Sequence, residues 1–217
     1  MEYFLNLVII FTSFLIFFIF KKSWSYVSKR GLVLLILLVF LVFIKAVAVG
    51  DISLIGFRLD NFSDTILPSI IFSLLGALIL FTMRFKNKKF KMVTWIISLV
   101  TLYLAFGIIQ QIFFQSIFTH TLSRLLNDKS LVVIFSAVFY SSFHWGWDSG
   151  GIKFGILTLF GGIVWTLLFL TSPNIFLLGA SHAVLAGIYY FIVRGENILE
   201  RRLSIKEGKG LLKFIFH

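Results

Sequence analysis

The feature that most constrains this chain is a series of long apolar runs separated by short polar or basic stretches. The runs cover residues 3–20, 31–50, 65–83, 92–118, 131–145, 152–170 and 175–193. About 20 apolar residues are enough for a helix to cross a ~30 Å hydrocarbon core. A helix also satisfies its own backbone hydrogen bonds in lipid. The sequence therefore predicts an all-α, polytopic membrane helix bundle of about seven transmembrane helices.

Composition and charge support a membrane protein and argue against a nucleic-acid partner. The chain is 59% hydrophobic, with 28 Phe among its 217 residues, whereas soluble domains are about 45–50% apolar. Its formal net charge is +11, but Lys and Arg fall between the apolar runs, where they set topology and meet anionic lipid. We therefore expect the lipid bilayer, and no nucleic acid, as a partner. The absence of Cys excludes disulfides, thiolate nucleophiles and Cys-based zinc sites.

The distribution of basic residues predicts the orientation. They concentrate after the first and third runs and in the tail. The positive-inside rule then places the N-terminus outside and the C-terminus in the cytoplasm, and we expect a bacterial plasma membrane. Lys45, near the end of the second run, is expected to extend its ammonium group toward the interface.

Three glutamines interrupt the fourth run. Gln111 and Gln115 are four residues apart and share a helical face, and Gln110 precedes them. Amide side chains at membrane depth are costly unless they face protein or water. They indicate either hydrogen bonding between helices or part of a functional site.

A histidine closes the fifth run. Tyr140 precedes His144 by four residues and Asp148 follows it by four, so the three share a face if the helix continues. His144 then fits a metal ligand or proton carrier, with Asp148 as second ligand or as the group that orients the ring. The alternative is a histidine in an interfacial aromatic belt with Trp145 and Trp147.

A second membrane histidine, His182, lies inside the seventh run among small residues. By itself it fits a packed histidine bonded to a neighbouring helix. Together, His144, His182 and Asp148 could hold one divalent metal ion, with Zn as the expected ion, and leave open positions for water or substrate.

These stretches, in this order and spacing, resemble the CPBP intramembrane protease family, also called the CaaX prenyl-protease type or Abi family. That family has a paired Glu with a downstream Arg, an aromatic-x-x-x-His and a His-x-x-x-Asn/Asp on successive parts of a membrane core. The corresponding segments here are 110–115 (QQIFFQ), 140–144 (YSSFH) and 182–186 (HAVLA). The resemblance implies a CPBP-like core at residues 92–194. The apolar runs and the charge pattern add N-terminal helices and basic loops (1–91) before it and a basic amphipathic cytoplasmic tail (195–217) after it.

The chain departs from the family pattern at the residues taken to activate water. Gln110 and Gln111 replace the paired Glu, Gln115 stands at the Arg position, and Ala186 stands at the final Asn/Asp position. A carboxamide is not a general base near neutral pH, although it can orient a water or bind a carbonyl.

Three hypotheses follow. The first is an intramembrane endopeptidase in which His144, His182, Gln111 and Asp148 carry catalysis, while Gln110, Gln115 and Tyr140 bind a membrane-associated peptide or protein substrate. The second is a non-catalytic relative that binds membrane peptides, lipids or a partner protein in an immunity or regulatory role. The third is a small transporter, which the absence of inverted halves disfavours.

Overall fold

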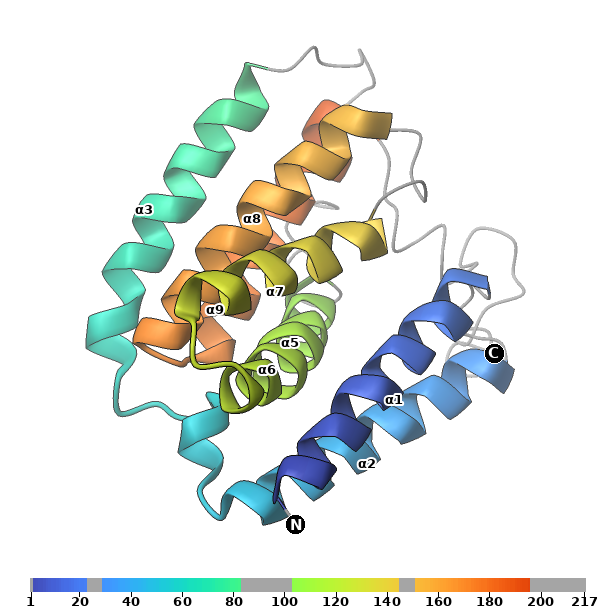
Figure 1. Cartoon of the computed structure of the whole chain (residues 1–217). Coiled ribbons are helices and arrows are strands. Elements are labelled where there is room, and N and C mark those ends of the chain that lie inside the picture. The colour runs from blue at the N-terminus through green and yellow to red at the C-terminus, as the bar shows by residue number, and fades with distance from the viewer. Residues whose placement is uncertain (1, 23–28, 83–102, 145–150, 196–217) are drawn as a thin grey trace, which may run out of the picture.

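The computed structural model describes residues 2–22, 29–82, 103–144 and 151–195, which form helices joined by short connections (Figure 1). These ranges contain no β-strand. The predicted all-α fold is therefore confirmed. Asp148 and the tail from residue 196 onward lie outside the described residues.

The N-terminal part is a helical hairpin that flanks the rest of the bundle. Helices α1 (Glu2–Lys22) and α2 (Lys29–Val49) lie side by side (Figure 1). A short 3₁₀ helix, η1 (Ile52–Ile55), follows them and leads into α3 (Phe62–Phe81). Phe14 and Phe17 of α1 pack edge-on or tilted against Phe139. Aromatic packing thus attaches the hairpin to the remaining helices.

A continuous helical segment carries the three glutamines. It consists of α5 (Leu104–Gln111), the π-helix η3 (Ile112–Thr119) and α6 (His120–Leu125). The sequence predicted an end near Phe118, whereas the helix continues until Leu126 adopts an extended backbone. The polar residues Thr119, His120 and Thr121 are buried, and α6 packs on α1. Tertiary contacts therefore keep helical a stretch whose composition suggests a connection.

The C-terminal helices complete the bundle. They are α7 (Lys129–His144), α8 (Gly151–Thr171), α9 (Ile175–Gly187) and its π-helical continuation η4 (Ile188–Val193). Helix α7 packs mainly on α8, and α5 on α9. A Cβ atom added at Gly107 would collide with the carbonyl oxygen of Gly179. The backbones of α5 and α9 are therefore in direct contact, as small residues allow in membrane bundles.

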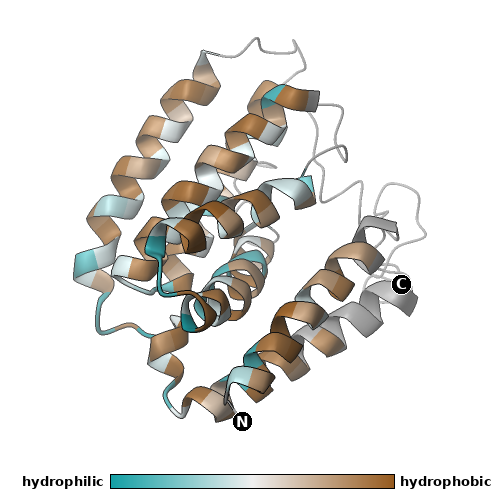
Figure 2. Ribbon diagram, in the orientation of Figure 1, coloured by the Kyte–Doolittle hydropathy of each residue, from teal (hydrophilic) through white to brown (hydrophobic). Residues whose placement is uncertain are grey.

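Within the described residues, three segments are long and apolar enough to cross a membrane. They are Phe62–Phe81, Ile152–Thr171 and Ile175–Val193. Hydrophobic residues dominate the helices, and hydrophilic residues gather toward the ends of several of them (Figure 2). The chain is an integral membrane protein by this architecture. The count of seven spans stays approximate.

Lys45 does not reach the surface, so the expected snorkelling is wrong. Its side chain is 2% exposed, and its Nζ donates a hydrogen bond to Asn6 Oδ1 at 3.2 Å. Helix α2 continues to Val49 beyond it, and a neighbouring helix supplies a polar partner. The Lys45 ammonium group therefore donates to Asn6 inside the protein instead of to water at the membrane interface.

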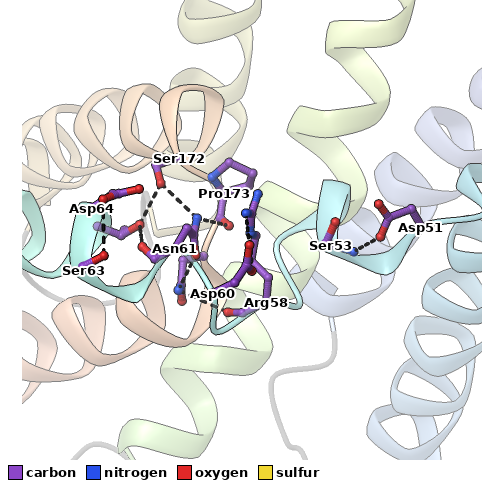
Figure 3. Close-up of polar contacts among 11 residues, drawn as sticks. Asp51, Ser53, Arg58, Asp60, Asn61, Ser63, Asp64, Ser172 and Pro173 are labelled. Atoms are coloured by element: carbon purple, nitrogen blue, oxygen red, sulfur yellow. Dashed lines mark hydrogen bonds and ion pairs between the residues drawn. The ribbon is translucent and has the colours of Figure 1, made fainter.

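A polar cluster joins the start of α3 to the connection between α8 and α9, and we call it the asparagine clamp (Asn61, Thr65, Ser172, Pro173 and Asn174). Asn61 Nδ2 donates to Ser172 Oγ at 2.9 Å and to the carbonyl of Pro173 at 3.0 Å (Figure 3). Asn174 Nδ2 donates to Asn61 Oδ1 at 2.9 Å, and the hydroxyls of Thr65 and Ser172 lie 2.8 Å apart. The clamp is largely buried and fixes where α9 begins.

The clamp also caps α9. Asn174 Oδ1 accepts a hydrogen bond from the Leu177 amide at 3.1 Å, which is the ordinary geometry of an N-cap. The Ile175 amide donates to the carbonyl of Gly56 at 3.0 Å. The segment after η1 therefore anchors the helix that carries His182.

Candidate functional site

The predicted site residues within the described ranges come from three parts of the bundle. Gln110 and Gln111 end α5, and Gln115 lies in η3. Tyr140 and His144 are one helical turn apart on α7, and His182 lies in the middle of α9. The fold brings most of these side chains together in one region, which no single sequence motif predicts.

His182 lies at the centre of this region and is 5% exposed. Gln111 Nε2 lies 3.1 Å from its Nδ1, and the Tyr140 hydroxyl lies 3.4 Å from its Nε2. Both ring nitrogens of His182 are therefore within hydrogen-bonding distance of a side chain from another helix.

A tryptophan that sequence reasoning missed holds the His182 ring. Trp165 of α8 stacks on it with a centroid separation of 4.7 Å and an interplanar angle of 22°. The indole Nε1 donates to Ser181 Oγ at 2.8 Å, so the stack is fixed by both a face contact and a hydrogen bond. A Trp in an apolar run also suits ordinary packing or an interfacial belt, and its sequence position therefore does not mark it.

His144 stands beside this centre and is only half-buried. Its Nδ1 lies 2.9 Å from the carbonyl oxygen of Tyr140, one turn earlier on α7. Its ring centroid lies 4.6 Å from that of Tyr140 and 6.4 Å from that of His182. The two histidines predicted to share a site are thus neighbours, with Tyr140 in contact with both.

Gln111 and Gln115 both point into the protein but contact different helices. Gln115 Nε2 donates to Thr166 Oγ1 of α8 at 3.4 Å, whereas Gln111 contacts His182 of α9. The helix is π-helical from Ile112 to Thr119, so its wider turns alter the register expected for an α-helix.

Within the part of the chain that the structure describes, the amide oxygens of the glutamines are buried without a hydrogen-bond partner. This holds for Oε1 of Gln110, Gln111 and Gln115. Gln111 and Gln115 are 0% and 1% exposed. A buried polar atom without a partner is costly, so each of these oxygens is able to accept a hydrogen bond from a donor that reaches it. Turning the Gln111 amide around would exchange its oxygen and nitrogen, and the atom that then faced away from His182 would still lack a partner.

The described residues do not by themselves make a metal site. They contain no group of three or more His, Asp, Glu or Cys side chains placed to hold an ion. Both nitrogens of His182 are near other side chains, and the third predicted ligand, Asp148, lies outside the described residues. The predicted Zn ion therefore stays a prediction.

The comparisons with known proteins agree with this location. Residues 92–188 match the family model "Type II CAAX prenyl endopeptidase Rce1-like". No curated protein and no solved structure gives a significant match. The matched region begins upstream of the glutamines and includes Tyr140, His144 and His182. This chain therefore carries an Rce1-like domain of the CPBP family at residues 92–188.

Proposed function

We propose that this CPBP-type membrane protein binds an amide-bearing ligand, such as the backbone of a membrane peptide, without hydrolysing it. The ligand would occupy the region of Gln111, Tyr140 and His182. The protein would then act as a binding or regulatory member of its family, in keeping with the second hypothesis from the sequence.

The observation that carries this proposal is the partner of His182. Where the family pattern has a Glu, Gln111 offers an amide to the ring, and an amide does not accept a proton from water near neutral pH. The described acidic residues lie at helix starts or in connections: Glu2, Asp51, Asp60, Asp64 and Asp128. The described part of the site therefore has histidine rings but no carboxylate base.

The glutamine oxygens favour a particular ligand chemistry. Three buried acceptors without partners suit a ligand that presents N–H donors. A peptide backbone presents N–H and C=O groups together, and an amide side chain complements both. The lipid interior offers no hydrogen-bond partners to the polar groups of such a ligand. Binding to the protein is therefore more favourable for the ligand than remaining in lipid.

The test measures binding and cleavage in one sample. Purified protein in lipid nanodiscs is mixed with a transmembrane peptide that carries a photo-crosslinker, and mass spectrometry counts cross-linked and cleaved products. We expect cross-linking without cleavage in the natural chain. Gln111→Leu should lower cross-linking about tenfold, since it removes hydrogen bonds to the ligand.

The matched control replaces an exposed amide outside the site. Asn127→Leu, in the connection between α6 and α7, should leave cross-linking unchanged. Cleavage by the natural chain that His182→Ala abolishes would overturn the proposal, and so would equal cross-linking by Gln111→Leu and Asn127→Leu.

Hydrolysis is the second candidate, and the proximity of the two histidines favours it. Their ring centroids are 6.4 Å apart, which allows one water molecule to contact both rings. In this mechanism Asp148 replaces the missing Glu as the base. Asp148→Asn should then abolish cleavage that Asp128→Asn retains, and equal cleavage by both variants would rule out this role.

Orientation in the membrane forms part of the proposal. Seven spans place the connections at residues 51–61 and 171–174 on the same, outer side, and the asparagine clamp joins these two connections. The natural chain has no Cys, so a single introduced cysteine reports its own exposure. With an impermeant thiol reagent on intact bacterial cells, Ser63→Cys should label and Lys88→Cys should not. The reverse pattern would refute this orientation.

A further inference from the structure

The connection between α2 and α3 exposes several large apolar side chains. We call residues 51–62 the anchor segment, which includes η1 and lies between one end of α2 and one end of α3 (Figure 1). Ile52, Leu54 and Leu59 are 54%, 43% and 69% exposed, and η1 is coloured as hydrophobic in Figure 2. Apolar surface left in water is unfavourable in proportion to its area. The segment therefore favours an apolar covering over water.

Exposed apolar residues continue on both sides of the anchor segment. Val47 of α2 precedes it, and Leu67 of α3 follows it. Phe62, the last residue of the segment, is also exposed and begins one of the spans long and apolar enough to cross a membrane. The apolar surface of the segment therefore runs into surface that faces hydrocarbon, at the level where α3 enters the bilayer.

The other side of the segment is bonded to the helices that carry the candidate site. Ile55 is buried, and its carbonyl accepts a hydrogen bond from the hydroxyl of Ser116, the residue after Gln115 on η3. The carbonyl of Gly56 accepts from the amide of Ile175 at the start of α9. The segment is thus attached to both the glutamine helix and the helix that carries His182.

The charged residues of the segment do not attract anionic lipid. Asp51 Oδ1 accepts a hydrogen bond from the Ser53 amide at 2.8 Å, and Arg58 donates to Asp60 (Figure 3). One Arg against two Asp gives residues 51–62 a formal net charge of −1. A segment held at a membrane surface by charge is rich in Lys and Arg. Burial of apolar surface is therefore the force that holds this segment in lipid.

We propose that the anchor segment inserts its exposed apolar side chains into the boundary between headgroups and acyl chains. Its partner is the phospholipid surface on the side of the asparagine clamp, whether the headgroups are zwitterionic or anionic. The charged side chains stay on the aqueous side. The inserted segment holds η3 and α9 at a fixed depth in the bilayer. This role does not depend on what the region of Gln111 and His182 binds.

The depth of the segment is measured with spin labels. The natural chain has no Cys, so Ile52→Cys and Leu59→Cys each carry one nitroxide label in lipid nanodiscs. Collisions with oxygen, which concentrates in lipid, are compared with collisions with a water-soluble nickel complex. We expect both labels to collide more with oxygen than with nickel. Leu67→Cys on α3 is the lipid reference. Asn127→Cys, in the exposed polar connection after α6, is the water reference and should show the reverse order.

Two further arms test what drives the insertion. Replacing part of the phosphatidylcholine by phosphatidylglycerol should leave both labels at the same depth, because charge does not hold the segment. Insertion that occurs only with phosphatidylglycerol would overturn the proposal. Ile52→Asn should move the label at Leu59 toward water, since it removes apolar surface from the same segment. Ser63→Asn replaces an exposed polar residue and should leave that label in place.

Thermal unfolding in nanodiscs tests whether the segment anchors the protein. The double variant Ile52→Asn, Leu59→Asn should lower the midpoint by about 4 °C. Both side chains are exposed within the protein, so what they lose is contact with lipid. Ser63→Asn should leave the midpoint unchanged. Equal midpoints in the double variant and Ser63→Asn would overturn the anchoring role. Labels at residues 52 and 59 that meet nickel as often as the label at residue 127 would overturn the insertion itself.

Discussion

Two polar clusters lie along the same helix, α9, and they differ in how completely their hydrogen-bonding groups are paired. In the asparagine clamp, Asn174 uses both side-chain hydrogens and its oxygen, and Asn61 does the same. Two turns further along, His182 is bonded to Gln111, whose oxygen has no partner. The clamp is complete within the protein, whereas the glutamine–histidine region is not.

This difference in hydrogen-bond pairing distinguishes a structural cluster from the region proposed to bind a ligand. A fully satisfied buried network rigidifies the fold and leaves nothing for a ligand. A network with unpartnered buried atoms costs stability, and such costs persist at places where a ligand or a reaction makes use of them. The contrast supports an anchoring role for the clamp and is consistent with the binding proposed for the region of Gln111 and His182.

The largest expected effect on stability comes from the close contact between helices α5 and α9. Gly107→Ala places a Cβ atom against the Gly179 carbonyl oxygen. Because this oxygen belongs to the backbone, it cannot move aside as a flexible side chain would. We expect a loss of about 3 kcal/mol in unfolding free energy, measured by denaturant titration in detergent. Ala105→Val on the exposed side of α5 is the control, with a change within about 0.5 kcal/mol. Similar losses in both would show that α5 and α9 are not in contact.

Breaking the clamp should cost nearly as much. Asn174→Ala removes the cap of α9 and leaves buried groups on Asn61 and the Arg58 backbone without partners. We expect about 2 kcal/mol of lost stability in the same titration. Asn127→Ala, an exposed asparagine, should be nearly neutral. If Asn174→Ala were equally neutral, the clamp would not anchor α9.

Metal binding provides a separate test of the region around His144 and His182. If the predicted ion is present, His144→Ala and His182→Ala should each weaken Zn or Co binding by more than about tenfold, as loss of a ligand requires. Elemental analysis of purified protein measures this, with His120→Ala as the variant that keeps its metal. Unchanged metal content in both site variants would exclude a metal at these histidines.

Replacement of Gln111 should change stability little and binding strongly. Gln111→Met removes the bond to His182 but also removes the buried oxygen that has no partner. The two effects oppose each other, so the unfolding free energy should change by less than about 1 kcal/mol. A loss as large as that of Asn174→Ala would make Gln111 part of the structural network instead.

The smallest effect is an acid dependence at the surface next to the clamp. Hydrogen bonding from Arg58 holds the pKa of the Asp60 carboxyl below its usual value. This contribution is complete above the unfolded pKa of about 3.9 and is lost as pH falls through the lower folded pKa. Asp60→Asn should lower the thermal midpoint slightly at pH 7 and remove this part of the acid dependence. An unaltered profile would show that the pair contributes nothing.

The sequence alone accounts for much of the helical architecture. Long apolar runs have few alternatives in a membrane, since backbone groups must be satisfied within the segment. The spacing of Tyr140 and His144 by four residues placed them on one face, and the structure agrees. The same reasoning ended the fourth helix about two turns too early. The helix continues there because Thr119, His120 and Thr121 are buried, and this burial outweighs the polarity of the local sequence.

What only the tertiary structure decided are the partners of each polar side chain. Lys45 was expected at the interface because snorkelling is inferred from the length of the side chain alone, yet a second helix supplies Asn6. Trp165 stacks on His182 from a helix whose sequence contains no sign of the contact. Helix formation depends on neighbours three or four residues away, whereas these contacts depend on where separate helices cross. For that reason the sequence determined which residues are polar within the membrane, and the packing determined which of them meet.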